Sequence, residues 1–385
     1  MANNKLILSQ AVEDISPAMS IKFNMEVYDL QRQGKDVIVL SLGEAFFKLP
    51  QFDFDESLFA KGCHYSSSWG LLELRQKISG YYNRYGVEAD PEKEILVSAG
   101  SKAIIYMVLL SIINPGDEVI IFEPAWVSYT EQVKLCYGRP VTVPYHENLD
   151  NLEKYITPKT KAIIINNPNN PSGKVYAKEE LQNLYNLAEK HGIFILSDEA
   201  YSDFVGQEPF YSMGAIDKEK KLSFVINSIS KCLGVSGWRI GYVIADKKYA
   251  NGILKVNQHL ITCPAALIEL CLVKYFDDIL KITAPQISEV METRRKVADY
   301  MDEIGLKYLP GSGTFYFMIS IEGSKLGSEE FALKLLREHN VSTVPGIGYG
   351  QSVDKFLRVS VGTESLERIK AGLSAVLELI KLTHE

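Results

Sequence analysis

Between residues 95 and 245, short apolar segments alternate with longer segments in which apolar residues recur at helical spacing. The apolar runs predict buried strands and the longer amphipathic segments predict helices. A chain that alternates strands with helices forms a mostly parallel sheet, because parallel neighbours need a helical crossover between them. We therefore expect an α/β fold whose sheet is covered by helices on both faces. The expected strands are residues 95–97, 118–122, 140–143, 161–165, 193–196, 223–227 and 241–245, and the expected helices are residues 71–85, 102–113, 126–135 and 178–191.

The pattern changes after about residue 282, where a smaller α+β domain is expected. A helix that Ser16 caps and Gly34 ends, and a strand at residues 37–42, come earlier in the chain and are expected to join it. Its other expected elements are a long charged helix at 286–303, strands at 315–319 and 355–361, and helices at 329–339 and 364–382. The predicted organisation is an N-terminal arm (1–14), a large domain (48–281) and a discontinuous small domain (15–47 and 282–385).

Charge and cysteine content argue against several classes of function. The net charge is −7 and there is no basic run, which disfavours nucleic-acid binding. The five cysteines are scattered without the CxxC spacing of a metal site, and we expect reduced thiols in a cytoplasmic protein. No signal peptide is expected, and the longest apolar-rich run, residues 103–113, is too short to cross a membrane.

Lys231 lies in the loop that follows the expected strand at residues 223–227. Open α/β sheets bind ligands beyond the carboxyl ends of their strands. A lysine amine there is a nucleophile for a carbonyl carbon once burial or nearby charge lowers its pKa. The hydroxyl of Ser228 and the guanidinium of Arg239 suit a phosphate. The loop therefore points to pyridoxal 5'-phosphate, an aldehyde that carries a phosphate, and the alternative is a solvated lysine and arginine.

Two other loops that follow strands suit the same cofactor. Gly100, Ser101 and Lys102 open a helix whose free N–H groups can hold an anion, although an ordinary helix cap explains them equally well. Trp126 can stack on a flat heteroaromatic ring, and the alternative is packing in the core.

Polar residues also follow the expected strands at 161–165 and 193–196. The amide of Asn170 can hydrogen-bond a phenolate oxygen, or its loop is an ordinary turn. The carboxylate of Asp198 can hold a pyridine nitrogen protonated, which makes the ring an electron sink, or it is an exposed helix cap. Tyr201 can reach the same side. Because all these loops are expected at one edge of the sheet, they jointly favour the cofactor.

From about Ser16 to its last helix, the chain resembles fold-type I pyridoxal-phosphate enzymes of the class I/II aminotransferase family. The resemblance rests on Asn-Asn-Pro-Asn-Asn-Pro-Ser-Gly, Ser-Asp-Glu-Ala-Tyr, and Ser-Ile-Ser-Lys followed by Gly-Trp-Arg-Ile-Gly-Tyr. It implies that Lys231 forms a Schiff base with the cofactor and moves the reacting proton, while Asp198 pairs with the ring nitrogen. The further implied cofactor contacts are Tyr201 and Asn170 at the phenolate oxygen, Trp126 on the ring, and Gly100, Ser101, Lys102, Ser228 and Arg239 at the phosphate.

Other matches to the family concern substrate and assembly. Arg358, in Phe-Leu-Arg-Val-Ser, resembles the arginine that clamps the substrate α-carboxylate, with Gly43 and Asn170 beside it. Tyr65 resembles the tyrosine that reaches the cofactor phosphate of the neighbouring subunit. The resemblance thus implies a homodimer with shared active sites, whose substrates are amino acids and 2-oxo acids.

The expected function is a pyridoxal-phosphate-dependent aminotransferase that moves an amino group between an L-amino acid and a 2-oxo acid by a ping-pong mechanism. The cofactor chemistry also serves lyases, decarboxylases, racemases and oxidases, which remain alternatives. A non-catalytic domain that senses the cofactor is more remote, because the segment before the first expected helix is too short for a DNA-binding helix-turn-helix. Phe46, Phe47 and Tyr349 suggest an aromatic or apolar substrate side chain, or simple packing.

Overall fold

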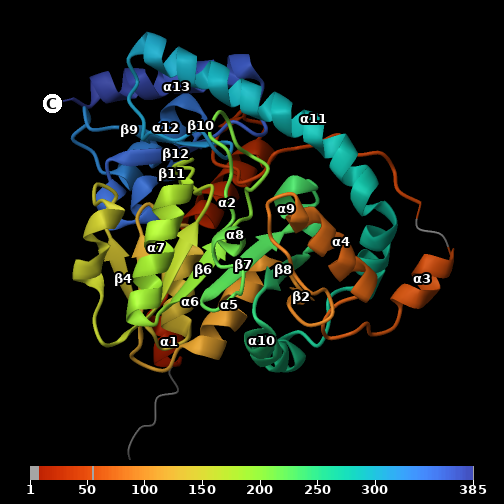
Figure 1. Ribbon diagram of the computed structural model, residues 1–385. Helices are drawn as coiled ribbons and strands as arrows, with labels where there is room; N and C mark the ends of the chain where they lie inside the picture. Colours follow the sequence, from red (N-terminus) through yellow and green to blue (C-terminus); the bar gives the residue numbers. More distant parts are fainter. Residues whose placement is uncertain (1–7, 54–55, 385) are drawn as a thin grey trace, which may run out of the picture.

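The computed structural model describes residues 8–53 and 56–384 of the chain (Figure 1). Its centre is a seven-stranded sheet in the order β2-β8-β7-β6-β5-β3-β4. Within this sheet β8 is antiparallel to both of its neighbours, while β7, β6, β5, β3 and β4 pair in parallel. The predicted α/β fold with a mostly parallel sheet is therefore confirmed. The strands are β2 (Ile95–Ser98), β3 (Glu118–Phe122), β4 (Arg139–Val143), β5 (Thr160–Asn166), β6 (Phe194–Asp198), β7 (Ser223–Ser228) and β8 (Gly241–Ile244).

Helices cover both faces of this sheet, because successive side chains of a strand point to opposite faces. Leu196 and Phe224 pack on one face with α5, α6 and α10. Their chain neighbours Ile195 and Val225 pack on the other face, against α7 and α8 and against α4 and α11. The bounds are α4 (Leu72–Asn83), α5 (Ser101–Ile112), α6 (Ser128–Leu135), α7 (Lys178–His191), α8 (Met213–Ile216), α10 (Lys247–Leu260) and α11 (Ala266–Ile304).

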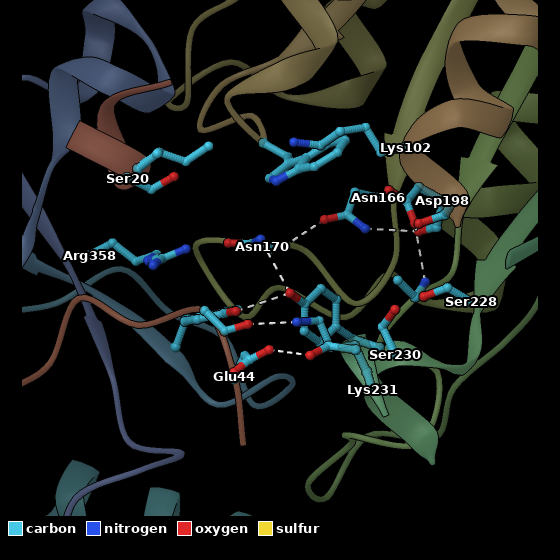
Figure 2. Close-up of a pocket in the computed structure, with 18 of the residues that line it drawn as sticks. Ser20, Glu44, Lys102, Asn166, Asn170, Asp198, Ser228, Ser230, Lys231 and Arg358 are labelled. Atoms are coloured by element: carbon cyan, nitrogen blue, oxygen red, sulfur yellow. Dashed lines mark hydrogen bonds between the residues drawn. The ribbon is translucent and has the colours of Figure 1, made fainter. Parts of the chain in front are cut away.

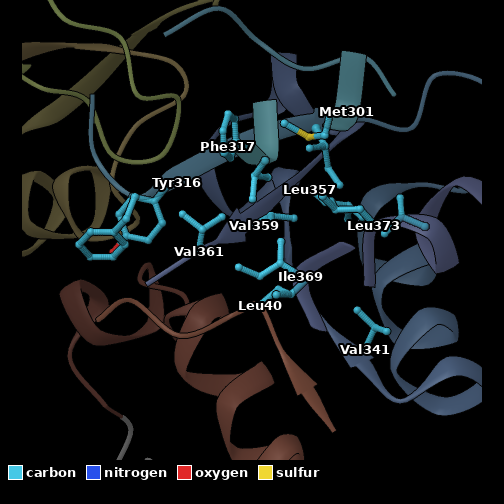
Figure 3. Close-up of a cluster of buried hydrophobic side chains, with 14 of the residues drawn as sticks. Leu40, Met301, Tyr316, Phe317, Val341, Leu357, Val359, Val361, Ile369 and Leu373 are labelled. Atoms are coloured by element: carbon cyan, nitrogen blue, oxygen red, sulfur yellow. The ribbon is translucent and has the colours of Figure 1, made fainter. Parts of the chain in front are cut away.

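A second, smaller unit packs around its own core (Figure 3). Its antiparallel sheet has the order β11-β12-β9, and a separate parallel pair joins β1 to β10. Leu357 and Val359 of β12 lie in this core with Leu373 of the last helix. The division of the chain into domains stays a prediction. The elements of this unit are α2 (Met19–Arg32), β1 (Ile38–Val39), β9 (Tyr316–Ser320), α12 (Ser328–His339), β10 (Val341–Ser342), β11 (Val344–Pro345), β12 (Phe356–Ser360) and α13 (Leu366–Leu382).

Helix α11 differs most from its prediction. It was expected to begin at residue 286, but it begins at Ala266 and runs for 39 residues, passing across the expected domain boundary at 282. Pro285 lies inside it. Proline removes one backbone donor, and a long helix with packing on both sides of that point tolerates the loss.

The N-terminal region also differs from expectation. Residues 10–13 of the expected arm form a helical turn, α1 (Gln10–Glu13), and residues 1–7 of that arm lie outside the described residues. Helix α2 begins at Met19, so Ser16 is not its cap; the Ser16 backbone N–H donates instead to Glu131. The strand expected at residues 37–42 is limited to β1, since the chain leaves the pairing with β10 to enter the cavity described below.

Further helices that were not expected from the sequence are α3 (Glu56–Gly62), α8 and α10. A one-turn helix, α9 (Ile229–Cys232), follows β7 and contains Lys231. Short 3-10 turns complete the chain at Leu149–Tyr155, Ser236–Trp238, Gly346–Tyr349 and Gln351–Val353. In the described part of the chain, no helix combines the length and the apolar character needed to cross a membrane.

Candidate active site

A cavity of about 530 Å³ opens at the carboxyl ends of the central strands, between the large sheet and the smaller unit (Figure 2). The sequence-predicted residues Lys231, Asp198 and Arg358 all line it. The strand register explains this convergence: Asn166 at the end of β5 pairs with Asp198 at the end of β6, and Ser228 ends β7 one strand further. Further predicted residues in its wall are Gly43, Ser101, Lys102, Trp126, Asn170, Tyr201, Ser228 and Arg239.

Lys231 presents its amine to the cavity from α9. Its Nζ donates a hydrogen bond of 2.6 Å to the carbonyl oxygen of Gly43. Burial of the amine lowers the pKa of Lys231 to about 8, and the charge of Glu44 in the same cavity opposes this shift. A substantial neutral fraction of the amine therefore exists near neutral pH, as a nucleophile or base requires.

Asp198 is buried at the end of β6 and held by donors on two sides. Tyr129 donates to its Oδ2 at 2.6 Å, and the backbone N–H of Ala200 donates to its Oδ1 at 3.2 Å. Burial raises the pKa of Asp198, while these two hydrogen bonds and the charge of Lys231 oppose the rise. The carboxyl group is therefore held in one position, and its charge depends on which group binds beside it.

Asn170 and Tyr201 meet in the wall between the central sheet and the smaller unit. The Nδ2 of Asn170 lies 3.3 Å from the hydroxyl of Tyr201, and its backbone N–H donates to Asn166 Oδ1 at 2.6 Å. The buried Oδ1 of Asn170 has no hydrogen-bond partner among the described residues. An unpaired polar atom in a cavity wall is a site for a polar ligand group.

At one end of the cavity, three chain segments form a cradle suited to an anion. Helix α5 begins at Ser101, directly after Gly100, which has a φ of 91°. That φ favours glycine, and a Cβ on Gly100 would lie 2.6 Å from the guanidinium of Arg239, which would have to move away. Ser228, at the end of β7, lies opposite Gly241 in the strand register and lines the same cavity. Helix N–H groups, a hydroxyl and a guanidinium are common ligands of phosphate.

Arg358 of β12 faces this cradle from the opposite side of the cavity (Figure 2). It is buried, and its guanidinium donates to the carbonyl of Ser41 at 2.5 Å. The guanidinium also lies over the ring of Tyr316, 4.5 Å from the ring centre, and 5.5 Å from that of Tyr349. These contacts fix the plane of the fork, which favours bidentate binding of a carboxylate.

The family model "Aminotransferase class I and II" matches residues 35–376 of the sequence. The chain belongs to the class I and II aminotransferase family. The aminotransferase is 33% identical over 392 residues to aromatic-amino-acid aminotransferase 2 of Thermococcus litoralis, covering 98% of this chain and 100% of that protein. It is 34% identical over 373 residues to the aspartate aminotransferase of Pyrococcus abyssi, covering 93% and 96% of the two chains.

A solved structure gives the same result. The aspartate aminotransferase of Thermus thermophilus with maleate superposes with a TM-score of 0.86 at 27% identity, covering 97% of this chain and all of that one. The predicted family, fold and enzyme class are thereby confirmed, and nothing in the comparisons favours the alternative lyase, decarboxylase, racemase, oxidase or sensor functions.

Some residues of this aminotransferase lie differently from the simplest expectation. Trp126 lines the cavity with the Lys102 amine 5.0 Å from its ring centre and its edge against Tyr129. Tyr65 does not line the cavity of its own chain and is 88% exposed.

The aromatic residues suggested for substrate selection do not line the cavity. Phe46 is exposed, Phe47 packs against Phe204, and Tyr349 lies behind Arg358. They therefore give no support to an aromatic or apolar substrate preference.

Several polar groups of the aminotransferase site were missed from sequence. Tyr316 is a tyrosine in a segment that otherwise resembles core, Tyr129 lies in a helix of mixed polarity, and Glu44 follows Gly43 without a distinctive pattern. The spacing of Tyr129, three residues after Trp126, is the one signal that a helical turn would bring both to the same side. The other cavity residues not predicted are Ser20, Ile21, Asn24, Asn166, Ala200, Ser230, Ser236 and Gly237.

Proposed function

We propose that this aminotransferase holds pyridoxal 5'-phosphate in the cavity and uses it to move an amino group between an L-amino acid and a 2-oxo acid. The observation that carries the proposal is the buried amine of Lys231, with a pKa of about 8, in one cavity with Asp198 and the anion cradle at Gly100 and Arg239. No single residue of this set is diagnostic. Together, the carboxyl of Asp198, the amine of Lys231 and the anion cradle match the ring nitrogen, the aldehyde and the phosphate of pyridoxal phosphate.

The residues present fit that group. The unpaired Oδ1 of Asn170 supports a polar ligand in the wall, and a cradle that a Cβ at Gly100 would fill supports close approach of a phosphate to the backbone. The proposed contacts in the cavity wall are Asp198 at the ring nitrogen, Tyr201 and Asn170 at the phenolic oxygen, Trp126 against the ring face, and Ser101, Lys102, Ser228 and Arg239 at the phosphate. Gly100 is not part of that wall, but it lies directly before Ser101 and next to the Arg239 guanidinium, and we propose it for the same phosphate.

When bound, pyridoxal phosphate supplies an electron sink for the bond that breaks at the substrate Cα. The residues of the chain supply position and proton movement. Arg358, together with the backbone at Gly43 and the amide of Asn170, holds the α-carboxylate, which orients the substrate. The Nζ of Lys231 takes the proton from Cα, which its lowered pKa allows near neutral pH.

We also propose a homodimer in which Tyr65 serves the partner's site. Tyr65 is 88% exposed in the single chain, and its resemblance to the family tyrosine that reaches the neighbouring subunit makes a second copy the partner that we propose to cover it. This assembly gives each site residues from two chains.

The test is a single half-reaction. Purified protein loaded with pyridoxal phosphate is mixed with one amino acid, and the cofactor absorbance and the released oxo acid are measured together. The names of the relatives make aspartate and an aromatic amino acid the first donors to try. We expect one oxo acid per site, with recovery of the original absorbance on adding a 2-oxo acid. Release of ammonia or peroxide without this reversible change would contradict the proposal.

A further inference from the structure

The hydroxyls of Tyr201 and Tyr316 form a hydrogen-bonded pair in the cavity wall, with 3.0 Å between their oxygens. Tyr201 follows β6 of the large sheet, whereas Tyr316 begins β9 of the smaller unit, 115 residues later in the chain. Both are buried and both line the cavity. Tyr316 lies at the edge of the smaller unit's core (Figure 3), so the pair joins the two parts of the site.

The direction of this hydrogen bond decides where the proton of Tyr201 can go. A tyrosine hydroxyl has one proton to donate and two lone pairs to accept with. Asn170 Nδ2 lies 3.3 Å from the Tyr201 oxygen and uses one lone pair. If Tyr316 donates, the second lone pair is also used, and the proton of Tyr201 must point to another acceptor. If Tyr201 donates to Tyr316 instead, its only proton is used in that hydrogen bond and is not available to a group in the cavity.

The surroundings favour Tyr316 as the donor. Burial raises the pKa of both hydroxyls, and that of Tyr201 stands well above its ordinary value; the guanidinium of Arg358 opposes the rise at both, and at Tyr316 it is the largest opposing influence. That guanidinium lies 4.5 Å from the centre of the Tyr316 ring. Of two neutral hydroxyls, the more acidic one is the better hydrogen-bond donor.

The other charged groups near the pair agree with this direction. Asp198 faces Tyr201 and makes its pKa higher, which weakens Tyr201 as a donor to Tyr316. Glu44 faces Tyr316 and raises its pKa, but the guanidinium of Arg358 lowers that pKa by more. Lys231 lies on the cavity side of Tyr201, with its Nζ 5.7 Å from the ring centre.

We propose that Tyr316 is a positioning residue, whose hydroxyl donates to Tyr201 and thereby directs the proton of Tyr201 into the cavity, toward the phenolic oxygen of the pyridoxal ring. This inference rests on the proposed function. Because the Arg358 guanidinium lies over the ring of Tyr316, one tyrosine has two roles. Its ring supports the proposed carboxylate clamp, and its hydroxyl orients the hydroxyl of Tyr201. Accepting two hydrogen bonds also makes Tyr201 a stronger donor, since hydrogen bonds in a chain polarise one another.

The test is the pH titration of the absorbance of the bound cofactor. A hydrogen bond donated to the phenolic oxygen withdraws charge from it, so the Lys231 nitrogen beside that oxygen holds its proton less strongly. Tyr316→Phe weakens this donation, and we expect the midpoint of the titration to move upward by about half a pH unit, a fraction of what one hydrogen bond contributes. Tyr201→Phe should move it further in the same direction.

Two comparisons make the result specific to the pair. Tyr316→Phe combined with Tyr201→Phe should titrate like Tyr201→Phe alone, because Tyr316 acts through Tyr201. Tyr349→Phe is the matched control: Tyr349 is also buried against Arg358, 5.5 Å from its guanidinium, but it makes no hydrogen bond to Tyr201 in the described structure. Its midpoint should equal that of the wild type.

Each outcome decides the proposal. A downward shift in Tyr316→Phe shows that Tyr201 donates to Tyr316, and an unchanged midpoint shows that the pair is only structural; either overturns it. Additive shifts in the double variant overturn it as well, and so does loss of the cofactor band in a Tyr316→Phe protein that melts like Tyr349→Phe. If the wild type itself acquires no titrating band with pyridoxal phosphate, it is the proposed function that fails.

Discussion

Tyr129 donates a hydrogen bond of 2.6 Å to Asp198, and both side chains are buried. Burial raises the pKa of Asp198, and this hydrogen bond opposes the rise. Tyr129→Phe should therefore weaken the binding of pyridoxal phosphate about 10- to 100-fold, as expected for a lost hydrogen bond to a charged group. The loss should grow as the pH falls, because the carboxyl of the variant is protonated at a higher pH. Equilibrium titration of cofactor-free protein at several pH values measures this, with the exposed Tyr137→Phe as control. Equal affinity for Tyr129→Phe and Tyr137→Phe would refute it.

Glu44 and Lys231 line the same cavity. Burial lowers the pKa of Lys231 to about 8, and the charge of Glu44 acts in the opposite direction. Glu44→Gln should lower the pKa of Lys231 further, since it removes an opposing charge. The rate at which cofactor-free protein reacts with pyridoxal phosphate should rise with pH through about 8 in the wild type and at a lower pH in the variant. Stopped-flow absorbance measures this rate. Glu147→Gln, outside this cavity, should keep the wild-type midpoint. A midpoint that moves upward in Glu44→Gln contradicts the assignment.

Arg358 is held by the carbonyl of Ser41 and by the ring of Tyr316. Arg358→Lys keeps the charge but loses the planar fork, so kcat/KM for amino acids should fall roughly 100-fold. Cofactor affinity should stay near the wild-type value, because Arg358 lies across the cavity from the proposed phosphate site. A loss of cofactor affinity as large as the loss of kcat/KM would place Arg358 in cofactor binding instead.

Tyr65 offers a test of the proposed dimer. If Tyr65 serves the partner's site, mixing inactive Lys231→Ala with weakened Tyr65→Ala rebuilds one complete site in each mixed dimer. Random exchange between two chains then restores up to about a quarter of wild-type activity in a symmetric dimer. Activity is measured before and after subunit exchange in mild denaturant. No gain in a sample in which exchange is shown by tagged chains would assign Tyr65 to its own chain or to no site.

Gly241, the first residue of β8, packs against the backbone of Gly100 and Ser101 in the anion cradle. A Cβ there would lie 2.3 Å from the backbone nitrogen of Ser101 and 2.5 Å from the Gly100 carbonyl carbon. Gly241→Ala should thus destabilise the protein by several kcal/mol, since backbone atoms must move, on the order of the cost of overpacking a core. Gly252→Ala in α10 meets no atom within 4 Å and should stabilise it by up to about 1 kcal/mol. Urea denaturation of the two variants should therefore give shifts of opposite sign, and shifts of the same sign would contradict the packing.

The sequence predicted best the strands and helices with strong apolar patterns and the polar residues that follow the strands. Residues 118–122 and 178–191 were predicted with their observed bounds, because apolar periodicity is strong there. Lys231 and Asp198 could be placed together because the carboxyl ends of parallel strands meet at one edge of the sheet.

Contacts between distant segments could not be predicted in this way. Tyr129 reaches Asp198 across 69 residues, and Tyr316 reaches Tyr201 across 115. Tyr316 lies in an apolar strand and Tyr129 in a helix of mixed polarity, and neither segment contains the partner that reveals the role of the hydroxyl. Tyr129 reaches Asp198 through the packing of α6 on the central sheet, whereas the hydroxyl of Tyr316 comes to the cavity wall through the packing of the smaller unit on that sheet.

Helix α11 also acts as a spacer between the two halves of the site. Thr283 donates from it to the carbonyl of Cys232, beside Lys231, at 2.7 Å. Arg294 donates from it to the carbonyl of Gly311, in the segment that leads to Tyr316, at 2.6 Å. The eleven helical steps from Thr283 to Arg294 span about 16 Å, and one inserted residue would turn one contact by about 100° relative to the other. The length of this segment is therefore fixed by the separation of the Lys231 amine and the opposite wall, even though none of its own side chains enters the cavity.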